Sequence, residues 1–365
     1  PKVGDIFKND DLGETLAILA EGGRDAFYKG KIAKTIDRYM RRIGGDLTYS
    51  DLATHTSEWV DPACVDYREV QLCELPPNGQ GFAALQMVSI LKNANLAQWN
   101  RDDPKVWHFL TEAKRLAFED LARYYADPAF ADIPTKELLS EEYGKKRFDL
   151  IDPESATTSF DPGEFSFTSE GDTTYLTVAD SSGMMVSLIQ SNYRGMGSGL
   201  VPDGLGFMLQ DRGELFSMDP SHPNAYEPGK RPFHTIIPAF IMQNGLPLMS
   251  FGLMGGSMQP QGHVQILINM FDYGMNPQEA GDAARMNHIG GRRPTGGNDD
   301  LLGVLHMEPG VSEETIKKLE DMGHQVQVVT DGVMFGGYQA IYRDQKTGVY
   351  IGATEMRKDG LAIGY

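Results

Sequence analysis

The stretch GDTTYLTVADSSGMMVSLIQSN, residues 171–192, decides the fold of this chain. Apolar and polar residues alternate on both sides of a turn sequence, Ser181-Ser182-Gly183, and this pattern predicts an antiparallel β-hairpin. A turn at these three residues sets residue 173 opposite residues 190–192, so Ser191 returns beside Thr173. We therefore expect two hydroxyl groups to meet at one end of the hairpin.

Thr173 heads the first strand of this hairpin and becomes an N-terminal nucleophile if the chain is cut between Asp172 and Thr173. A threonine hydroxyl is a poor nucleophile at neutral pH, but a free α-amine on the same residue can act as its general base. Cleavage of the 172–173 bond would create that base. The alternative interpretation is that Thr173 and Thr174 are ordinary β-branched strand residues, and the pair by itself leaves both interpretations open.

A glycine-rich turn, Gly255-Gly256-Ser257, follows the strand-like run LPLMSFG. Two glycines between a strand and a helix permit unusual backbone angles and leave adjacent N–H groups at a positive helix end, as an oxyanion hole requires. The chain has 41 glycines, so a simple turn is the competing interpretation. The motifs GxSxG, GxxxxGK[ST], GxGxxG and HExxH are absent, so no signature supports a serine hydrolase, a nucleotide-binding protein or a zincin.

Composition excludes some partners. The 365 residues carry a net charge of −18 and no basic cluster longer than Lys145-Lys146-Arg147, which argues against nucleic acid. No apolar stretch is long enough to span a bilayer, and the first residues, PKVGDIFKNDDLGE, show no signal peptide. The chain starts at Pro1 rather than Met, which suggests that an upstream segment exists, so we leave localisation open between cytoplasm and periplasm.

The two cysteines, Cys64 and Cys73, flank one strand-like run. They have neither CxxC spacing nor a Cys/His ligand pattern, so we expect two buried thiols rather than a metal site or a disulfide.

The order of elements favours an α+β fold. About the first 150 residues predict mostly helices, whereas alternating strands begin at residue 173, and no strict βαβ repeat links them. No linker separates the two halves, so one large domain is as consistent with the sequence as two. Predicted helices cover residues 12–19 before Gly22-Gly23, 32–43 before Gly44-Gly45, 82–91 and 104–124, with later ones after Gly255-Gly256, Asn276 and Ser312; predicted strands include 175–180, 184–191, 235–242 and 248–251.

The order of motifs resembles the γ-glutamyltransferase family over the whole chain. The matching stretches are PKVGDIFKNDDLGETLAILAEGG, YYADPAF, TTYLTVAD, SNYRGMGSGLV, PGKRPFHTIIPAF, GGS and GATEMRKDGLAIGY. The resemblance implies an N-terminal-nucleophile hydrolase with a four-layer αββα sandwich, made as a precursor that cuts itself and uses no cofactor or metal. It assigns residues 1–172 to the mostly helical C-terminal part of a large subunit and 173–365 to the small subunit, which together form one αββα domain.

The same resemblance implies roles for individual residues. Thr173 becomes the catalytic nucleophile after cleavage between Asp172 and Thr173, Ser191 is the second hydroxyl that hydrogen-bonds it, and Gly255 and Gly256 supply the oxyanion amides. The implied reaction is acyl transfer from a γ-glutamyl amide of the glutathione type to water, an amino acid or a peptide, through an acyl-enzyme. The implied partners are these small molecules and the two subunits of one precursor, associated as a heterodimer.

Departures from the family pattern fall in the substrate pocket. The family's acidic residue that holds the glutamate α-amino group falls on Leu215, and its nearby glutamine falls on Arg212. An arginine opposes a substrate ammonium and favours a carboxylate. Glutaryl side chains, as in the related cephalosporin acylases, are therefore the alternative substrate class, although Glu214 could serve the ammonium if the local register shifts by one residue.

Three further substrate-binding candidates also differ from the family. Tyr193 stands where an asparagine is usual, and His234 and Thr235 replace the two serines that bind the glutamate carboxylate. His234 is equally consistent with a polar residue that satisfies a loop, and Arg231 and Arg357 are expected to hold structure. These departures keep a second alternative open, an unprocessed, non-catalytic relative that binds small molecules.

Overall fold

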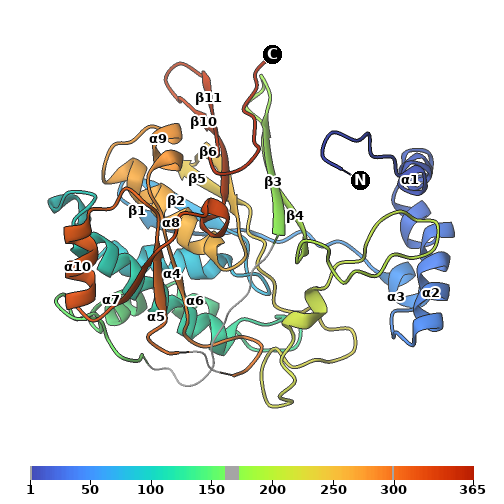
Figure 1. Ribbon diagram of the computed structural model, residues 1–365, viewed down its shortest axis with the longest axis horizontal. Helices are drawn as coiled ribbons and strands as arrows, with labels where there is room; N and C mark the ends of the chain where they lie inside the picture. The colour runs from blue at the N-terminus through green and yellow to red at the C-terminus, as the bar shows by residue number, and fades with distance from the viewer. Residues whose placement is uncertain (1, 161–171, 298–299) are drawn as a thin grey trace. The chain divides into compact units, whose positions relative to one another are not determined.

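A computed structural model describes residues 2–160, 172–297 and 300–365 of the chain (Figure 1). These residues form two compact units, one of Pro1–Val60 with Arg194–Asp211 and one of Asp61–Tyr193 with Arg212–Tyr365. The sequence left one domain and two equally open, and the assignment of both parts to one αββα domain stays a prediction. The predicted boundary between residues 172 and 173 lies inside the second unit, so the division into large- and small-subunit parts concerns covalent processing and stays a prediction.

The first unit is helical. It contains α1 (Asp10–Tyr28), α2 (Lys31–Ile43) and α3 (Tyr49–Thr54), and its small core joins Ile32 and Ile36 of α2 to Leu205. The predicted end of α2 is confirmed, because Gly44 closes the helix in the left-handed conformation with φ 77°. The predicted end of α1 at Gly22-Gly23 is wrong: Gly23 interrupts the helix, which then continues to Tyr28.

A six-stranded antiparallel sheet forms the centre of the second unit. Its strand order is β1-β2-β5-β6-β10-β11. Most of β6 is buried, as expected of a strand covered on both faces. The strands are β1 (Ala63–Tyr67), β2 (Val70–Glu74), β5 (Ala239–Gln243), β6 (Leu246–Met254), β10 (Gly337–Arg343) and β11 (Tyr350–Thr354).

The predicted hairpin is present as β3 (Asp172–Ala179) and β4 (Met185–Tyr193). It packs against one face of the sheet. The Thr177 and Ser250 hydroxyls are hydrogen-bonded, and Ser187 Oγ donates to the Phe251 carbonyl at 3.3 Å. Gly252 makes room for this packing, because a Cβ there would lie 2.4 Å from carbons of the Tyr175 ring.

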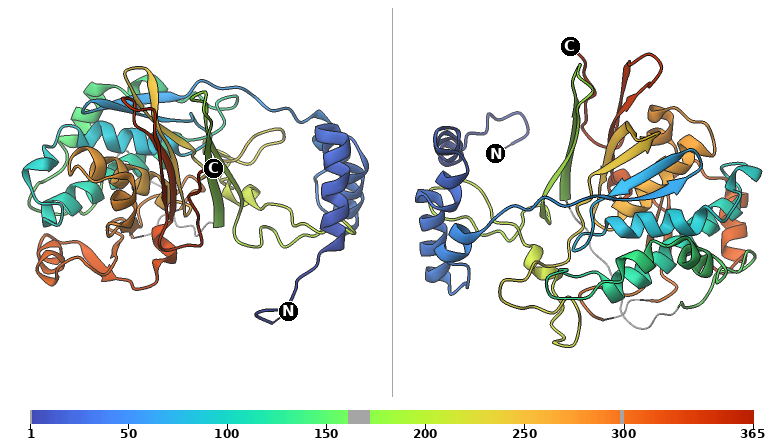
Figure 2. Two further views of the ribbon diagram at one scale, coloured as in Figure 1. Left: turned by 90° about the horizontal axis from the view of Figure 1, so that it is seen from above. Right: turned by 180° about the vertical axis from the view of Figure 1, so that it is seen from behind.

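Helices α4 (Gly81–Leu91) and α8 (Met258–Phe271) pack against the sheet on the side away from the hairpin (Figures 1 and 2). Successive residues of β6 point to opposite faces: Gly252 meets the hairpin, whereas the Leu253 side chain packs against Gly262 of α8. All residues of α4 are buried, because α5 (Pro104–Tyr124) covers its outer side. The mixed α+β class is confirmed, and the four-layer sandwich stays a prediction.

The described residues of this unit also form smaller elements. They are α6 (Thr135–Leu138), α7 (Glu141–Phe148), α9 (Pro277–Asp282), α10 (Glu313–Asp321), three short 3₁₀ helices (Leu96–Gln98, Arg212–Leu215 and Gly332–Phe335) and a three-stranded sheet of β7 (Met286–Ile289), β8 (Val304–Met307) and β9 (Gln325–Val328). Among the helices of the described residues, none combines the length and apolar character that crossing a bilayer requires.

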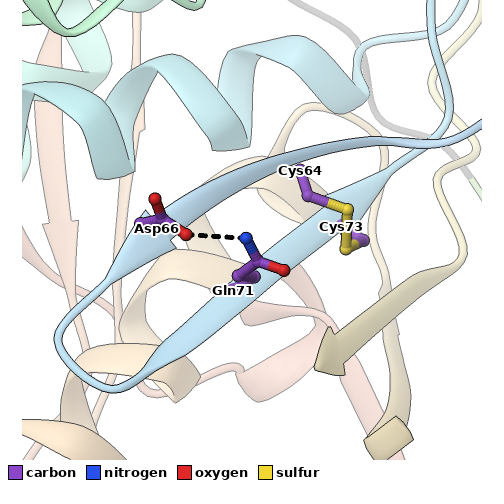
Figure 3. Close-up of a disulfide and its surroundings, with 4 residues drawn as sticks. All are labelled: Cys64, Asp66, Gln71 and Cys73. Carbon is purple, nitrogen blue, oxygen red and sulfur yellow. Dashed lines mark hydrogen bonds between the residues drawn. A yellow bond between two sulfur atoms is a disulfide. The ribbon is translucent and has the colours of Figure 1, made fainter. Parts of the chain in front are cut away.

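The expectation of two free thiols is wrong, because Cys64 and Cys73 form a disulfide (Figure 3). The run between them is a hairpin rather than one strand: it turns at Arg68, which adopts a φ of 51°, and pairs β1 with β2. In this register Cys64 lies directly opposite Cys73, and their Cα atoms are 4.1 Å apart. The cysteines are close because of strand pairing, which sequence spacing alone did not reveal.

Candidate active site

Thr173 and Ser191 lie together where the hairpin ladder becomes irregular. Asp172 pairs with Tyr193 and Thr174 pairs with Gln190, so two residues of β4 face Thr173 alone. Such a bulge turns side chains out of the regular alternation. Thr173 Oγ1 donates a hydrogen bond to Ser191 Oγ at 3.2 Å, and the Thr173 residue is only 4% exposed. The two hydroxyls predicted to meet are therefore in contact.

Tyr193 ends β4 in a strained conformation. Its φ is 77°, in the left-handed region that non-glycine residues rarely adopt, and its side chain is buried. Its backbone N–H donates to Ser191 Oγ at 2.8 Å, so the same turn of the chain holds the hydroxyl that faces Thr173. The guanidinium of Arg212 lies over the Tyr193 ring, 5.4 Å from its centre. Tyr193 thus connects the hydroxyl pair to the arginine.

Arg212 begins the 3₁₀ helix Arg212–Leu215 and is buried. Its Nη1 donates to Thr235 Oγ1 at 3.3 Å, and Thr235 is fully buried. Leu215, which the resemblance aligns with an acidic residue, belongs to the hydrophobic core, while Glu214 is exposed on the same short helix. The structure therefore brings Arg212 and Thr235 together and places a cation in the interior at this point.

His234 precedes Thr235 and lies against the loop before α4. Its backbone N–H donates to the Asn78 carbonyl at 3.2 Å, and a Cβ on Gly79 would lie 2.7 Å from its ring. Burial of the imidazole, together with the positive charges of Arg212 and Arg231, lowers the pKa of His234 to about 3. A group with this pKa is neutral at pH 7 and accepts protons poorly. His234 is therefore a weak candidate for a general base.

The Gly255-Gly256 turn has the geometry that needs glycine. The φ angles are 124° and 57°, and the turn leads directly into α8. The Gly255 and Gly256 carbonyls accept the N–H groups of Met258 and Gln259, at 3.0 and 3.2 Å, so they point into the first turn of the helix. The amides at this end of the helix point the opposite way, as in anion-binding helix termini.

The packing of the hairpin on β6 relates Thr173 to this turn. Thr177 contacts Ser250, and Tyr175 packs on Gly252, so each step of two residues along β3 is matched by two residues along β6 in the opposite direction. One further step brings Thr173 level with Met254, the residue before Gly255.

Gln80 is a residue that the sequence analysis missed. It lies just before α4, and its Nε2 donates to the Thr235 carbonyl at 2.6 Å and to the Gly256 carbonyl at 2.8 Å. It thereby joins the arginine side of the site to the glycine turn. The only local signal was an amide side chain in PPNGQG immediately before a wholly apolar run. One continuous set of contacts thus links the predicted residues Thr173, Ser191, Tyr193, Arg212, Thr235 and Gly256, with His234 and Gly255 next to it in the chain. For Asp172 only the backbone is described.

Arg231 and Arg357, expected to hold structure, make structural ion pairs. Arg231 Nη2 donates to Asp127 Oδ1 at 2.9 Å, and Arg357 binds both Glu308 and Glu355. No group of three or more His, Cys, Asp and Glu side chains that could hold a metal occurs within residues 2–160, 172–297 and 300–365.

A mixed α+β fold with a threonine at the head of a strand, a second hydroxyl against it and a glycine turn at a helix end is the arrangement of the N-terminal-nucleophile hydrolases. The chain belongs to the γ-glutamyltranspeptidase family, whose model matches residues 1–365. The predicted family is therefore confirmed, including its kinship with the acylases.

Three relatives show the range of this family. The chain is 36% identical over 364 residues to the glutathione hydrolase-like YwrD proenzyme of Bacillus subtilis and 33% identical over 365 residues to the oxamate amidohydrolase proenzyme of Klebsiella pneumoniae; each match covers 100% of this chain and 67% of the relative. The crystal structure of cephalosporin acylase from Bacillus halodurans superimposes with a TM-score of 0.89 at 40% identity, over 100% of this chain and 65% of that one. The chain thus spans about two thirds of the length of these relatives.

Proposed function

We propose that this chain is the catalytic part of a self-processing acyltransferase or amide hydrolase whose nucleophile is Thr173, released by cleavage after Asp172. The observation that carries the proposal is the hydrogen bond from Thr173 Oγ1 to Ser191 Oγ at the buried head of β3. A strand residue without a catalytic role needs neither a hydroxyl partner nor the bulge that supplies it. Membership of a family that includes proenzymes supports the same interpretation.

The mechanism follows from the contacts. After cleavage, the free α-amine of Thr173 takes the proton from Oγ1, which attacks the amide carbonyl carbon of the substrate. Ser191 orients Oγ1, and the N–H groups of Gly255 and Gly256 stabilise the negative charge that develops on the carbonyl oxygen. The α-ammonium returns the proton to the departing amine, which leaves an ester on Thr173. Water or an acceptor amine then attacks the ester by the same steps in reverse and frees the threonine.

The acyl group proposed first is γ-glutamyl, as in glutathione, with the large and small subunits remaining together as a heterodimer. Arg212 supports a second candidate, a glutaryl-type acyl group. This buried guanidinium, held by Thr235 and Tyr193, suits a substrate carboxylate and opposes an ammonium. The likeness to a cephalosporin acylase and to a hydrolase of oxamate, an amide that carries a carboxylate, favours the same candidate.

The first experiment tests cleavage. The full-length gene is expressed, and intact mass and N-terminal sequencing are applied to the wild type, Thr173→Ala and Thr173→Ser. We expect a fragment that begins at residue 173 in the wild type and in Thr173→Ser, and none in Thr173→Ala. The fragment would divide the present 365 residues into 172 and 193. A wild-type chain that stays uncut would refute the enzyme proposal and support the non-catalytic, small-molecule-binding alternative.

The second experiment separates the two acyl groups. The kcat/KM values for glutaryl and γ-glutamyl anilides are compared in the processed enzyme, in Arg212→Gln and in Arg231→Gln. Loss of one charge-assisted hydrogen bond should lower the glutaryl-to-γ-glutamyl ratio by roughly ten- to a hundredfold in Arg212→Gln. Arg231→Gln is the matched control, because that arginine pairs with Asp127, and should leave the ratio unchanged. An unchanged ratio in Arg212→Gln would mean that Arg212 does not select the acyl group.

A further inference from the structure

Gln80 is the N-cap residue of α4, yet its side chain makes no hydrogen bond that caps the helix. Residues at this position usually hydrogen-bond the helix's own free N–H groups. The amide of Gln80 instead lies inside the protein, with the residue 1% exposed, and makes both of its described bonds to other segments. The Gln80 side chain therefore connects other segments instead of stabilising the first turn of α4.

Both partners of Gln80 are backbone carbonyls, from Thr235 and Gly256, at 2.6 and 2.8 Å. A carbonyl only accepts hydrogen bonds, so the nitrogen end of the amide must face both, and its two N–H groups are both used. The two carbonyls lie 155 and 176 residues further along the chain. One side chain thus joins two distant segments, which the Gln259 side chain also joins by accepting from the Ile237 N–H at 3.0 Å.

Each anchored carbonyl belongs to a residue of the proposed site. Gly256 has no side chain to limit its backbone rotation and adopts a φ of 57°. The bond from Gln80 fixes its carbonyl oxygen and limits rotation about its Cα–C bond, which helps to hold the residue whose N–H is proposed to stabilise the oxyanion. Thr235 presents its Oγ1 to Arg212. The amide of Gln80 therefore lies between the group proposed to stabilise the oxyanion and the group proposed to bind the acyl chain.

We propose that Gln80 is a positioning residue, which holds the Gly256 amide and the Thr235–Arg212 pair at the separation that the acyl group of the substrate spans. The inference rests on the proposed function. A displacement of about 1 Å between a bound carbonyl and its oxyanion donors is enough to slow an acyl transfer strongly. In this role Gln80 acts through its bonds to the two carbonyls rather than through contact with the substrate.

The test replaces Gln80 by methionine, which has a similar length and no donor. The matched control is Gln86→Met: Gln86 is also buried in α4, but donates to Asp120 Oδ2 at 2.7 Å and accepts from the Tyr125 hydroxyl. We expect Gln80→Met to lower kcat on the preferred anilide and the rate of self-cleavage, each by about ten- to a hundredfold. Gln86→Met should lower the melting temperature and leave kcat within about twofold of the wild type.

A second variant, Gln80→Glu, tests the pH dependence of kcat, which a merely structural role of Gln80 would not change. Its carboxylate faces two carbonyls and donates to neither, whereas its protonated form donates to one. Its kcat relative to wild type should therefore rise as pH falls. Three results would overturn the inference. These are pH profiles of kcat that run parallel in Gln80→Glu and the wild type, a kcat of Gln80→Met within about twofold of the wild type, or an equal loss of kcat in Gln80→Met and Gln86→Met. An uncut, inactive wild type would instead refute the proposed function, and this inference with it.

Discussion

Replacing both cysteines by serine should lower the free energy of unfolding by about 2.6 kcal/mol. The disulfide closes a loop with a sequence separation of 9 between Cys64 and Cys73. The chain-entropy relation for such a loop gives a loss of about 8.7 cal/mol/K from the unfolded chain, which corresponds to about 2.6 kcal/mol at 25 °C. The native hairpin needs no rearrangement, because the five residue pairs of β1 and β2 already set the cysteines opposite each other.

Urea unfolding of the wild type and the double variant, with and without dithiothreitol, measures this loss. Reduction should bring the wild type down to the stability of the Cys64→Ser, Cys73→Ser protein and leave that protein unchanged, which controls for effects of the reductant elsewhere. Two results would refute the reasoning: a difference below about 1 kcal/mol between the proteins, or alkylation of both cysteines in the denatured wild type without reductant.

Three other perturbations test the packing and the buried charges. Gly252→Ala sets a methyl group 2.4 Å from the Tyr175 ring and should cost about 1–3 kcal/mol in thermal denaturation and slow self-cleavage; wild-type cleavage would contradict the packing of the hairpin on β6. The pKa of His324 is lowered from 6.5 to about 3, chiefly by burial, so the unfolded chain binds more protons between these values and stability falls as pH drops below 6.5. This histidine alone should make the free energy of unfolding, measured with urea, about 2 kcal/mol lower at pH 5 than at pH 7. If His324→Gln showed the same pH dependence as the wild type, His324 would not be its cause. Glu355→Gln leaves the fully buried Arg285 without its carboxylate and should cost about 3–5 kcal/mol; a loss under about 1 kcal/mol by calorimetry would show that the pair is not buried as described.

Local patterns predicted much of the fold. The hairpin was predictable because alternation and a Ser-Ser-Gly turn both lie within residues 171–192, and its register alone then placed Ser191 beside Thr173. Helices α2 and α8, and the capping box at Asn276, likewise depend on residues within a few positions of one another.

Features that depend on distant partners were not predictable in the same way. The strand expected over 235–242 begins only at Ala239, because the carbonyl of Thr235 and the N–H of Ile237 bond to the side chains of Gln80 and Gln259, and residue 238 is a proline without an N–H. The β1–β2 turn at Arg68 has no glycine or proline to mark it.

Strand β6 is closely approached on both of its faces, by the Tyr175 ring at Gly252 and by helix α8 at Leu253. Random mutagenesis aimed at new acyl preferences should therefore yield few functional variants within β6. A larger side chain on either face of this strand would displace the β3–β4 hairpin or helix α8. Productive diversity should come from the surroundings of Arg212 and His234, where single side chains meet the proposed pocket. The Gly255-Gly256 turn that follows β6 would then stay constant when the acyl preference changes, whereas the residues around Arg212 would vary.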